Sequence, residues 1–169
     1  MKRTSLSWPR LGQGIGLART ASLAWQLGLD LSALGKRAIV ITGSNGKGST
    51  ASMLTALLGF AGERVGTFTS PHLFRFNERV RINGEPVDDP ALLAAEARVA
   101  AAIERDRQNH PDDGFGEFEA WFLAALCLFE AEGCERLVIE AGIGGRYDPT
   151  RLLQAPLAAI VSVDLEHTA

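Results

Sequence analysis

The feature that most constrains this chain is residues 37–50, in which an apolar run leads through a glycine-rich turn into a stretch with helical spacing. Residues 37–42 (RAIVIT) are short, β-branched and flanked by glycine, which predicts a buried strand. Residues 47–61 predict a helix that carries on one face Met53, Leu54, Leu57, Leu58 and Ala61. A glycine turn between a buried strand and a helix N-terminus is a place where α/β proteins bind phosphate.

The turn reads GSNGKGST and departs from the strict phosphate-loop pattern at both ends. Ile41 stands where the pattern has its first glycine, and Gly48 rather than a hydroxyl residue follows Lys47. The physical components are nevertheless present, because glycines let backbone N–H groups turn inward, a lysine adds positive charge and a nearby hydroxyl can reach a magnesium ion. The predicted nucleotide-binding residues are Asn45, Gly46, Lys47, Gly48, Ser49 and Thr50. The alternative is a structural strand-to-helix turn with an exposed lysine.

The rest of the chain alternates between strand and helix patterns. Strands are predicted at 64–69, 136–141 and 157–163, and helices at 17–29, at 89–107 with Asp89 as cap, and at 117–133. Residues 1–17 and 106–116 are expected to be irregular, and ERVRING at 78–84 to form a β-arm. The last helix places on its apolar face Phe118, Trp121, Phe122, Ala125, Leu126 and Phe129. This alternation predicts one α/β domain with a three-layer, mostly parallel sheet.

The composition of the chain indicates which classes of binding partner to expect. The chain has 169 residues, 46% of them hydrophobic, which suffices for one buried core. A net charge of −3 with interspersed signs argues against a nucleic-acid or membrane partner, and no apolar run has membrane-spanning or signal-peptide length. Cys127 and Cys134 are interpreted as reduced packing residues rather than as metal ligands or a disulfide. We therefore expect a cytoplasmic protein with small-molecule partners.

Four motifs follow one another between residues 39 and 167: GSNGKGST, TFTSPHLFRFNERVRING, FE within a helix, and IEAGIGGRYD. In this order they resemble the folylpolyglutamate synthase/dihydrofolate synthase family of the Mur ligase superfamily. The resemblance implies an ATP- and Mg²⁺-dependent ligase that phosphorylates a folate-type carboxylate (pteroate or folyl) and joins it to L-glutamate through an acyl phosphate. Such chemistry needs positioning and charge neutralisation more than a nucleophilic side chain, and the sequence offers no obvious Ser-His-Asp or Cys-His set.

The resemblance also implies site residues. Matching the motifs residue by residue gives a magnesium site of Ser70, Glu140 and His167, the loop hydroxyl at Ser49, and catalytic roles for Lys47, Glu140 and His167. Glu140 is supported independently, because a carboxylate at the carboxyl end of a buried strand is costly unless a cation or hydrogen bonds meet it. Its alternative role is that of a cap or ion-pair partner. Taken alone, Ser70 is an ordinary turn serine and His167 a surface or packing residue.

On the substrate side the resemblance implies contacts from Phe118, Tyr147 and Asp148. The sequence departs from the family here, with Gly116 in place of a threonine and GIGGRYDPTR in place of the usual GLGGRLDATN. A paralogous ligase acting on a different carboxylate therefore stays open. The charged residues after Pro71 fit either a solvated arm or a substrate contact, namely Arg75, Glu78, Arg79 and Arg81.

Members of the family are longer than 169 residues. The expectation is that residues 1–169 form the N-terminal portion of the ATP-binding domain without the C-terminal ligase domain, inactive alone and able to self-associate through an incomplete sheet. Two other classes remain open: a nucleotide-binding module without ligase activity, and a small-molecule kinase. The long SPHL segment counts against the kinase.

Overall fold

A computed structural model describes residues 16–108 and 116–164 of the chain, and its centre is a single sheet. The sheet has six strands in the order β4-β3-β2-β5-β1-β6. Strands β2, β5, β1 and β6 run parallel, whereas β3 and β4 form an antiparallel extension at one edge. In chain order the strands are β1 Ala38–Thr42, β2 Val65–Phe68, β3 Val80–Ile82, β4 Glu85–Pro86, β5 Arg136–Glu140 and β6 Leu157–Ile160. The predicted mostly parallel α/β fold is confirmed.

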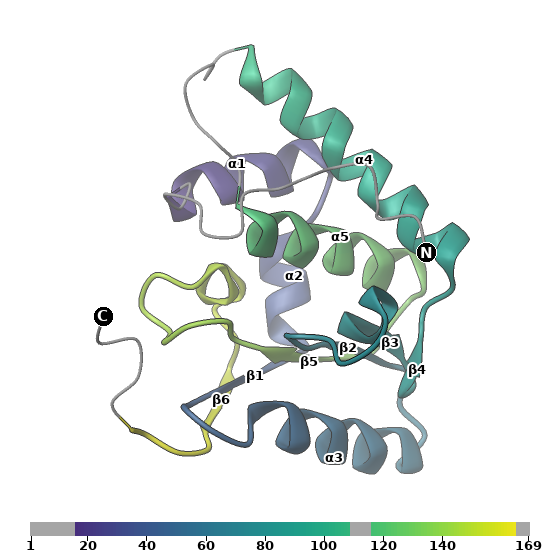
Figure 1. Ribbon diagram of the computed structural model, residues 1–169, viewed down its shortest axis with the longest axis vertical. Coiled ribbons are helices and arrows are strands. Elements are labelled where there is room, and N and C mark those ends of the chain that lie inside the picture. The colour runs from purple at the N-terminus through teal and green to yellow at the C-terminus, as the bar shows by residue number, and fades with distance from the viewer. Residues whose placement is uncertain (1–15, 109–115, 165–169) are drawn as a thin grey trace.

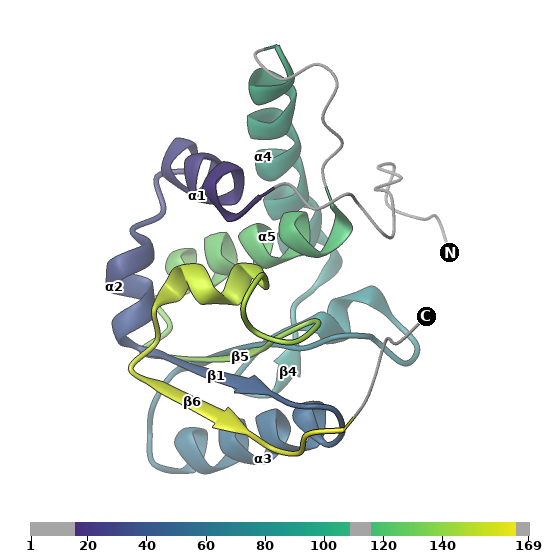
Figure 2. The ribbon, with the colours of Figure 1, turned by 90° about the vertical axis from the view of Figure 1, so that its left-hand side faces the viewer.

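Helices cover both faces of this sheet (Figures 1 and 2). Helix α3 lies alone on the lower face, α5 lies on the upper face, and α1 and α4 pack outside α5. Together with two short 3₁₀ helices, η1 and η2, the elements are α1 Leu17–Gln26, α2 Leu31–Lys36, α3 Lys47–Phe60, η1 Phe76–Arg79, α4 Asp89–Arg107, α5 Glu117–Ala131 and η2 Pro149–Leu153. The expected three layers are present, and α1 and α4 add a partial fourth.

Helix α5 is the centre of the core. Every residue from 120 to 129 of this helix is buried, as its apolar pattern predicts. Gly66 in β2 makes this packing possible, because a Cβ atom there would lie 2.5 Å from the ring of Phe129. Cys127 and Cys134 are buried in the same region and free, in agreement with their predicted packing role.

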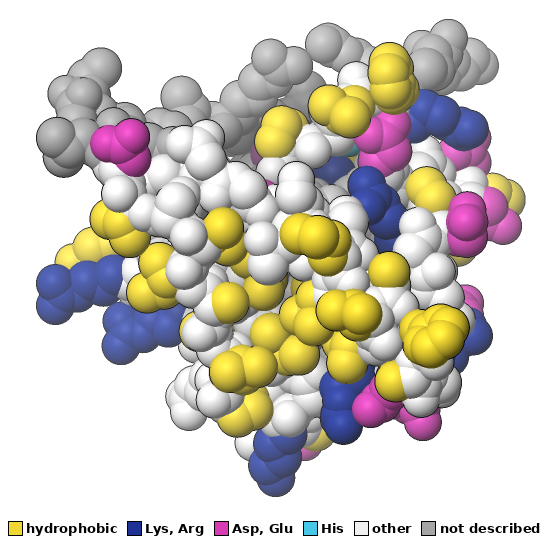
Figure 3. All heavy atoms as spheres, turned by 90° about the horizontal axis from the view of Figure 1, so that it is seen from below, with side chains coloured by type: hydrophobic (Ala, Val, Ile, Leu, Met, Phe, Trp, Pro, Cys, Tyr) yellow, Lys and Arg dark blue, Asp and Glu magenta, His cyan; other side chains and the backbone are white. Residues whose placement is uncertain are grey.

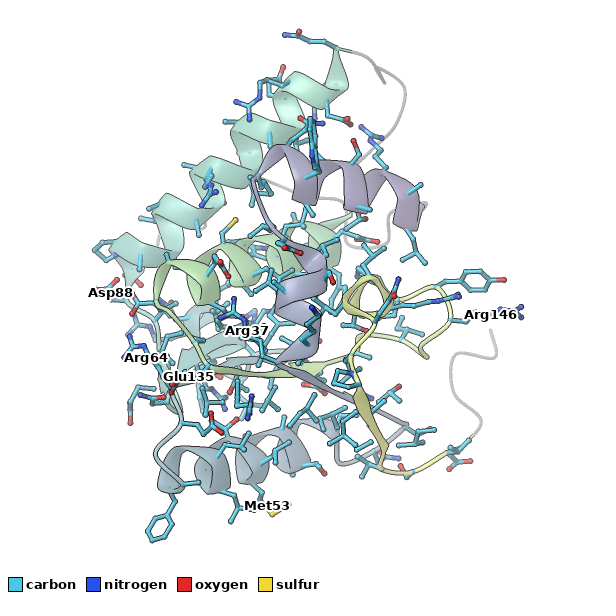
Figure 4. All side chains as sticks on the ribbon, turned by 180° about the vertical axis from the view of Figure 1, so that it is seen from behind. Arg37, Met53, Arg64, Asp88, Glu135 and Arg146 are labelled. Carbon is cyan, nitrogen blue, oxygen red and sulfur yellow. The ribbon has the colours of Figure 1, made fainter. Side chains whose placement is uncertain are left out.

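The inner face of α3 differs from the prediction. Met53 and Leu57 are 61% and 68% exposed, and Figure 4 shows Met53 on the side of α3 away from the sheet. The buried positions are Ala51 and Thr55, and the hydroxyl of Thr55 lies 2.6 Å from that of Thr67 in β2. Apolar residues are distributed all around α3. The side that carries the small Ala51 and the hydroxyl of Thr55 makes the close contact with the sheet.

Three predicted boundaries also shift. The helix expected over 17–29 ends at Gln26, and a helix that was not predicted, α2, follows it, capped by Asp30, which accepts the Ala33 N–H at 2.9 Å. Helix α4 is capped by Asp88, which accepts the Ala91 N–H, rather than by Asp89. Strand β6 ends at residue 160 rather than 163, since its only neighbour in the described sheet, β1, ends at Thr42.

Candidate phosphate-binding site

The glycine loop lies where β1 ends and α3 begins. Gly46 is the N-cap of α3 and has a left-handed backbone, with φ at +84°. Since the first amides of a helix have no intrahelical acceptor, the N–H groups at the start of α3 are free to meet an anion, and the helix dipole favours one there. The first turn of α3 carries no acidic residue that would repel it. Phosphate binding by these residues stays a prediction, and the helix start offers the free amides that it requires.

Lys47 folds back over the loop it follows. Its Nζ donates hydrogen bonds to the carbonyl oxygens of Gly43 at 2.6 Å and Ser44 at 3.1 Å. The ammonium group is thereby held above the turn rather than extended into solvent, which is not the exposed lysine of a purely structural turn. A phosphate at the start of α3 would meet a fixed positive charge.

Glu140 faces the same place from the end of β5. It is 3% exposed, and its Oε2 accepts the backbone N–H of Ser70 at 2.9 Å. A Cβ atom built on Gly48 would lie 3.7 Å from Oε2, so the carboxylate abuts the beginning of α3. Burial raises the pKa of Glu140 above its ordinary value, and the Ser70 N–H, Lys47 and Arg81 partly offset that rise. A buried, partly compensated carboxylate fits a nearby cation.

Three of the four predicted magnesium ligands lie among the described residues. The structure brings Ser70 and Glu140 together beside the start of α3, where Ser49 also lies, whereas His167 lies outside the described residues. Within 16–108 and 116–164 there is no group of three His, Cys, Asp or Glu side chains that could hold a metal ion. The described oxygen donors, two serine hydroxyls and one carboxylate, are nonetheless of the type that Mg²⁺ prefers. Their role as ligands stays a prediction.

The predicted substrate residues separate into two groups. Phe118 packs at a tilt against Phe68 with a ring-centroid distance of 5.6 Å, and its ring lies 3.0 Å from where a Cβ of Gly142 would be. Asp148 is buried and accepts N–H groups from Gly142 at 2.8 Å and Thr150 at 2.9 Å. The acid therefore shapes the glycine turn. Tyr147, in contrast, is 81% exposed.

The loop after β2 has an organising residue whose role the sequence did not indicate. Glu78 accepts backbone N–H groups from Leu73 at 2.8 Å, Phe74 at 3.0 Å and Arg75 at 2.6 Å, and these bonds hold its pKa below the ordinary value. The loop is thus fixed while Leu73 and Phe74 remain more than 80% exposed. Part of the predicted solvated arm is therefore an ordered 3₁₀ turn, with Glu78 as its internal acceptor.

A second such residue is Ser162, which follows β6. Its hydroxyl accepts the Asn45 N–H at 2.8 Å, and its carbonyl accepts the Ser44 N–H at 2.9 Å. Only the parallel pairing of β1 with β6 brings the loop and residue 162 together, so the linear pattern gave no signal for it. The backbone amide of Asn45 consequently points to this serine.

Parallel strands that meet a glycine loop, a helix N-terminus and a buried carboxylate at their carboxyl ends form an arrangement typical of phosphate-binding α/β domains. No family model matches the sequence. Curated relatives do: the chain is 39% identical over 163 residues to folylpolyglutamate synthase of Lacticaseibacillus casei, covering 95% of this chain and 37% of that protein. It is 35% identical to dihydrofolate synthase/folylpolyglutamate synthase of Escherichia coli K12, covering 91% of this chain and 34% of that protein.

Solved structures of the same enzymes also match the chain. A complex of folylpolyglutamate synthase with AMPPCP and folate matches with a TM-score of 0.87 and 38% identity over 96% of this chain and 39% of that one. Escherichia coli FolC with DHPP and ADP matches with a TM-score of 0.83 and 33% identity over 97% of this chain and 37% of that one. Over 91–97% of its length the chain is homologous to folylpolyglutamate synthases/dihydrofolate synthases, and it spans a little over a third of the length of these relatives.

Proposed function

We propose that the chain supplies the nucleotide-binding part of an ATP-dependent ligase that forms an amide between a folate-type carboxylate and L-glutamate. The observation that carries this proposal is the convergence of Lys47, the amides that begin α3 and the buried Glu140 on one spot. Relatives solved with ADP or AMPPCP, and in one case with folate, support the choice of ligands. A cytoplasmic location is part of the proposal and is supported by the two free cysteines.

The geometry suits phosphoryl transfer to a carboxylate. The carboxylate oxygen attacks the γ-phosphorus of ATP, ADP leaves, and the amine of glutamate then attacks the acyl carbon and releases phosphate. Lys47 and the α3 amides would hold the phosphates and offset negative charge as it shifts to the leaving oxygen. Magnesium, when bound, would neutralise further phosphate charge, and Ser49, Ser70 and Glu140 offer it oxygen ligands.

The acceptor carboxylate would lie near the turn that follows β5. The ring of Phe118 and the carboxylate of Asp148 both lie against Gly142, two residues after Glu140 at the end of β5, and this supports an acceptor site beside the proposed phosphate site. The departures from the family at Gly116 and Tyr147 lie on either side of this turn in the sequence, and the exposed Tyr147 would help to select the carboxylate.

Because the chain spans a little over a third of its relatives, we propose that complete turnover needs polypeptide beyond the matched part. The test is phosphate release from ATP with dihydropteroate or tetrahydrofolate plus glutamate, measured for residues 1–169 and for a full-length relative of the same family. We expect acceptor-dependent release from the relative only, together with MgATP binding by both. Acceptor-dependent release by residues 1–169 would overturn the requirement for further polypeptide, and absence of MgATP binding would overturn the ligase assignment.

We also propose that the open edge of the sheet is an assembly surface through which a second copy of the chain can pair. Strand β6 has a described neighbour on one side only, and its Leu157 and Ile160 are 55% and 67% exposed. Figure 3 shows hydrophobic side chains gathered on the face where α3 lies, which the exposed Met53, Leu57 and Phe60 of that helix help to form. An uncharged edge strand beside an apolar helix face is a template for strand pairing.

A further inference from the structure

Ser162 binds the phosphate loop through both its side chain and its backbone. The Asn45 N–H donates to the Ser162 hydroxyl at 2.8 Å, and that hydroxyl donates to the Asn45 carbonyl at 3.1 Å. The Ser44 N–H donates to the Ser162 carbonyl at 2.9 Å. One residue from the far end of the chain therefore satisfies three polar groups in the first half of the loop.

A second set of contacts holds the same two segments together. The Asp164 N–H donates to the Ser44 hydroxyl at 2.8 Å, and the Ser44 hydroxyl donates to the Asp164 carbonyl at 3.3 Å. Gly43 approaches so closely that a Cβ atom there would lie 2.6 Å from the Ser162 carbonyl oxygen, and its φ of +131° also favours glycine. The glycine that opens the loop is thus required by the contact with residue 162 as well as by its own conformation.

These contacts divide the loop into two halves. The amides of Ser44 and Asn45 are engaged by Ser162 and are turned away from a ligand, whereas the amides at the start of α3 have no intrahelical acceptor. Lys47 bonds to the carbonyls of Gly43 and Ser44, so its position depends on where that first half is held. Fixing residues 43–45 therefore fixes the charge that faces the phosphate.

We propose that Ser162 is a positioning residue of the phosphate loop, and that its hydroxyl holds Asn45 so that Lys47 and the first amides of α3 are aligned for the phosphates of ATP. The inference rests on the proposed function only in its choice of ligand. It assigns to residue 162 a role in nucleotide affinity although Ser162 itself faces the loop backbone and not the phosphate position.

The experiment compares Ser162→Ala, which removes the hydroxyl, with Ser162→Thr, which keeps it, and with the control Ser32→Ala on the exposed side of α2. Calorimetric titration with MgATP should show affinity reduced about tenfold in Ser162→Ala and within about threefold of wild type in Ser162→Thr, as expected for loss of one bridging hydroxyl. Ser32→Ala should match wild type. Unchanged affinity in Ser162→Ala would overturn the proposal.

Amide hydrogen exchange without nucleotide separates a positioning role from general destabilisation. In Ser162→Ala the Asn45 amide loses its acceptor and should exchange at least about tenfold faster, while the Ser44 amide, whose acceptor is the retained carbonyl, should change less. Uniform acceleration across the sheet would overturn the positioning role. If the wild type fails to bind MgATP, the ligase assignment falls, and the exchange pattern alone decides whether Ser162 positions the loop.

Discussion

The Ser70 backbone N–H donates to Oε2 of Glu140 at 2.9 Å, and this bond joins the ends of two neighbouring parallel strands beside the phosphate loop. It aims a buried carboxylate at the start of α3, where a Cβ of Gly48 would be 3.7 Å away. A side chain at position 48 would be in ordinary van der Waals contact with this carboxylate, so Glu140 lies close to the start of α3, with Ser49 one residue further along.

Glu140→Gln tests whether this carboxylate serves a cation. The amide keeps the shape of the side chain and can still accept the Ser70 N–H, but it removes the negative charge. Calorimetry with and without the metal gives the factor by which magnesium strengthens ATP binding. We expect this factor to be at least about tenfold smaller in Glu140→Gln than in wild type. Glu135→Gln, at the residue before β5 begins, is the control and should retain the full magnesium effect. Equal magnesium effects in Glu140→Gln and wild type would show that the carboxylate has only a structural role.

Gly43→Ala tests the close approach between the loop and the segment after β6. The new methyl group would meet the Ser162 carbonyl oxygen at 2.6 Å in a backbone region unfavourable to alanine, so we expect the free energy of unfolding to fall by about 2 kcal/mol or more. Gly59→Ala in α3 has open space around its Cβ and should instead gain up to about 1 kcal/mol. Chemical denaturation measures both, and a neutral Gly43→Ala would contradict the contact.

Glu96 gives the fold a defined response to pH. Its Oε1 has no hydrogen-bond partner among the described residues, and burial between α4 and α5 raises the pKa of this carboxyl. At low pH the group is neutral in both the folded and unfolded chain. As pH rises, the unfolded chain ionises first, so the free energy of unfolding falls as pH rises above the ordinary pKa of a glutamate.

Glu96→Gln removes this titration. We expect the variant to lose the Glu96 contribution to the pH dependence of the free energy of unfolding, and to gain stability relative to wild type as pH rises. Denaturant titrations at several pH values measure it, with Glu104→Gln on the exposed side of α4 as the matched control. Parallel pH profiles for wild type and Glu96→Gln would show that Glu96 ionises freely in the folded chain.

Ile160→Lys tests the proposed assembly surface. A lysine on an edge strand opposes strand pairing, so the variant should be monomeric at concentrations where the wild type forms dimers in sedimentation equilibrium. Leu93→Lys, on the exposed side of α4, should leave the dimer intact. If the wild type is monomeric at the highest soluble concentration, the chain does not pair through this edge and the proposed assembly surface is wrong.

Much of this architecture could be predicted from local patterns. The strand, glycine loop and helix at 37–60 and the apolar repeat of α5 are encoded in contiguous residues, so periodicity and turn chemistry identify them. The inner face of α3 could not be identified in this way, because Met53 and Leu57 are as apolar as a buried face requires while contacts with β2 decide which side is inward.

The residues of the site likewise include some that local patterns predict and some that they do not. Lys47 and Glu140 stand at positions that a linear motif and a strand end can indicate. Ser162 meets the loop only after β1 and β6 pair, so its role has no signal in its own neighbourhood. Glu78 accepts amides three to five residues before it, but only the turn formed there aims those amides at its carboxylate. The roles of residues that organise the site through backbone groups therefore could not be predicted from the sequence pattern.

Titration of Lys47→Ala with MgATP tests most directly whether GSNGKGST binds nucleotide phosphate. Lys36→Ala, at the exposed end of α2, provides the matched control. Loss of a charge-assisted contact should weaken binding by about 1.5–3 kcal/mol in Lys47→Ala alone. Wild-type affinity in the folded Lys47→Ala variant would show that the loop is a structural turn and would contradict the account.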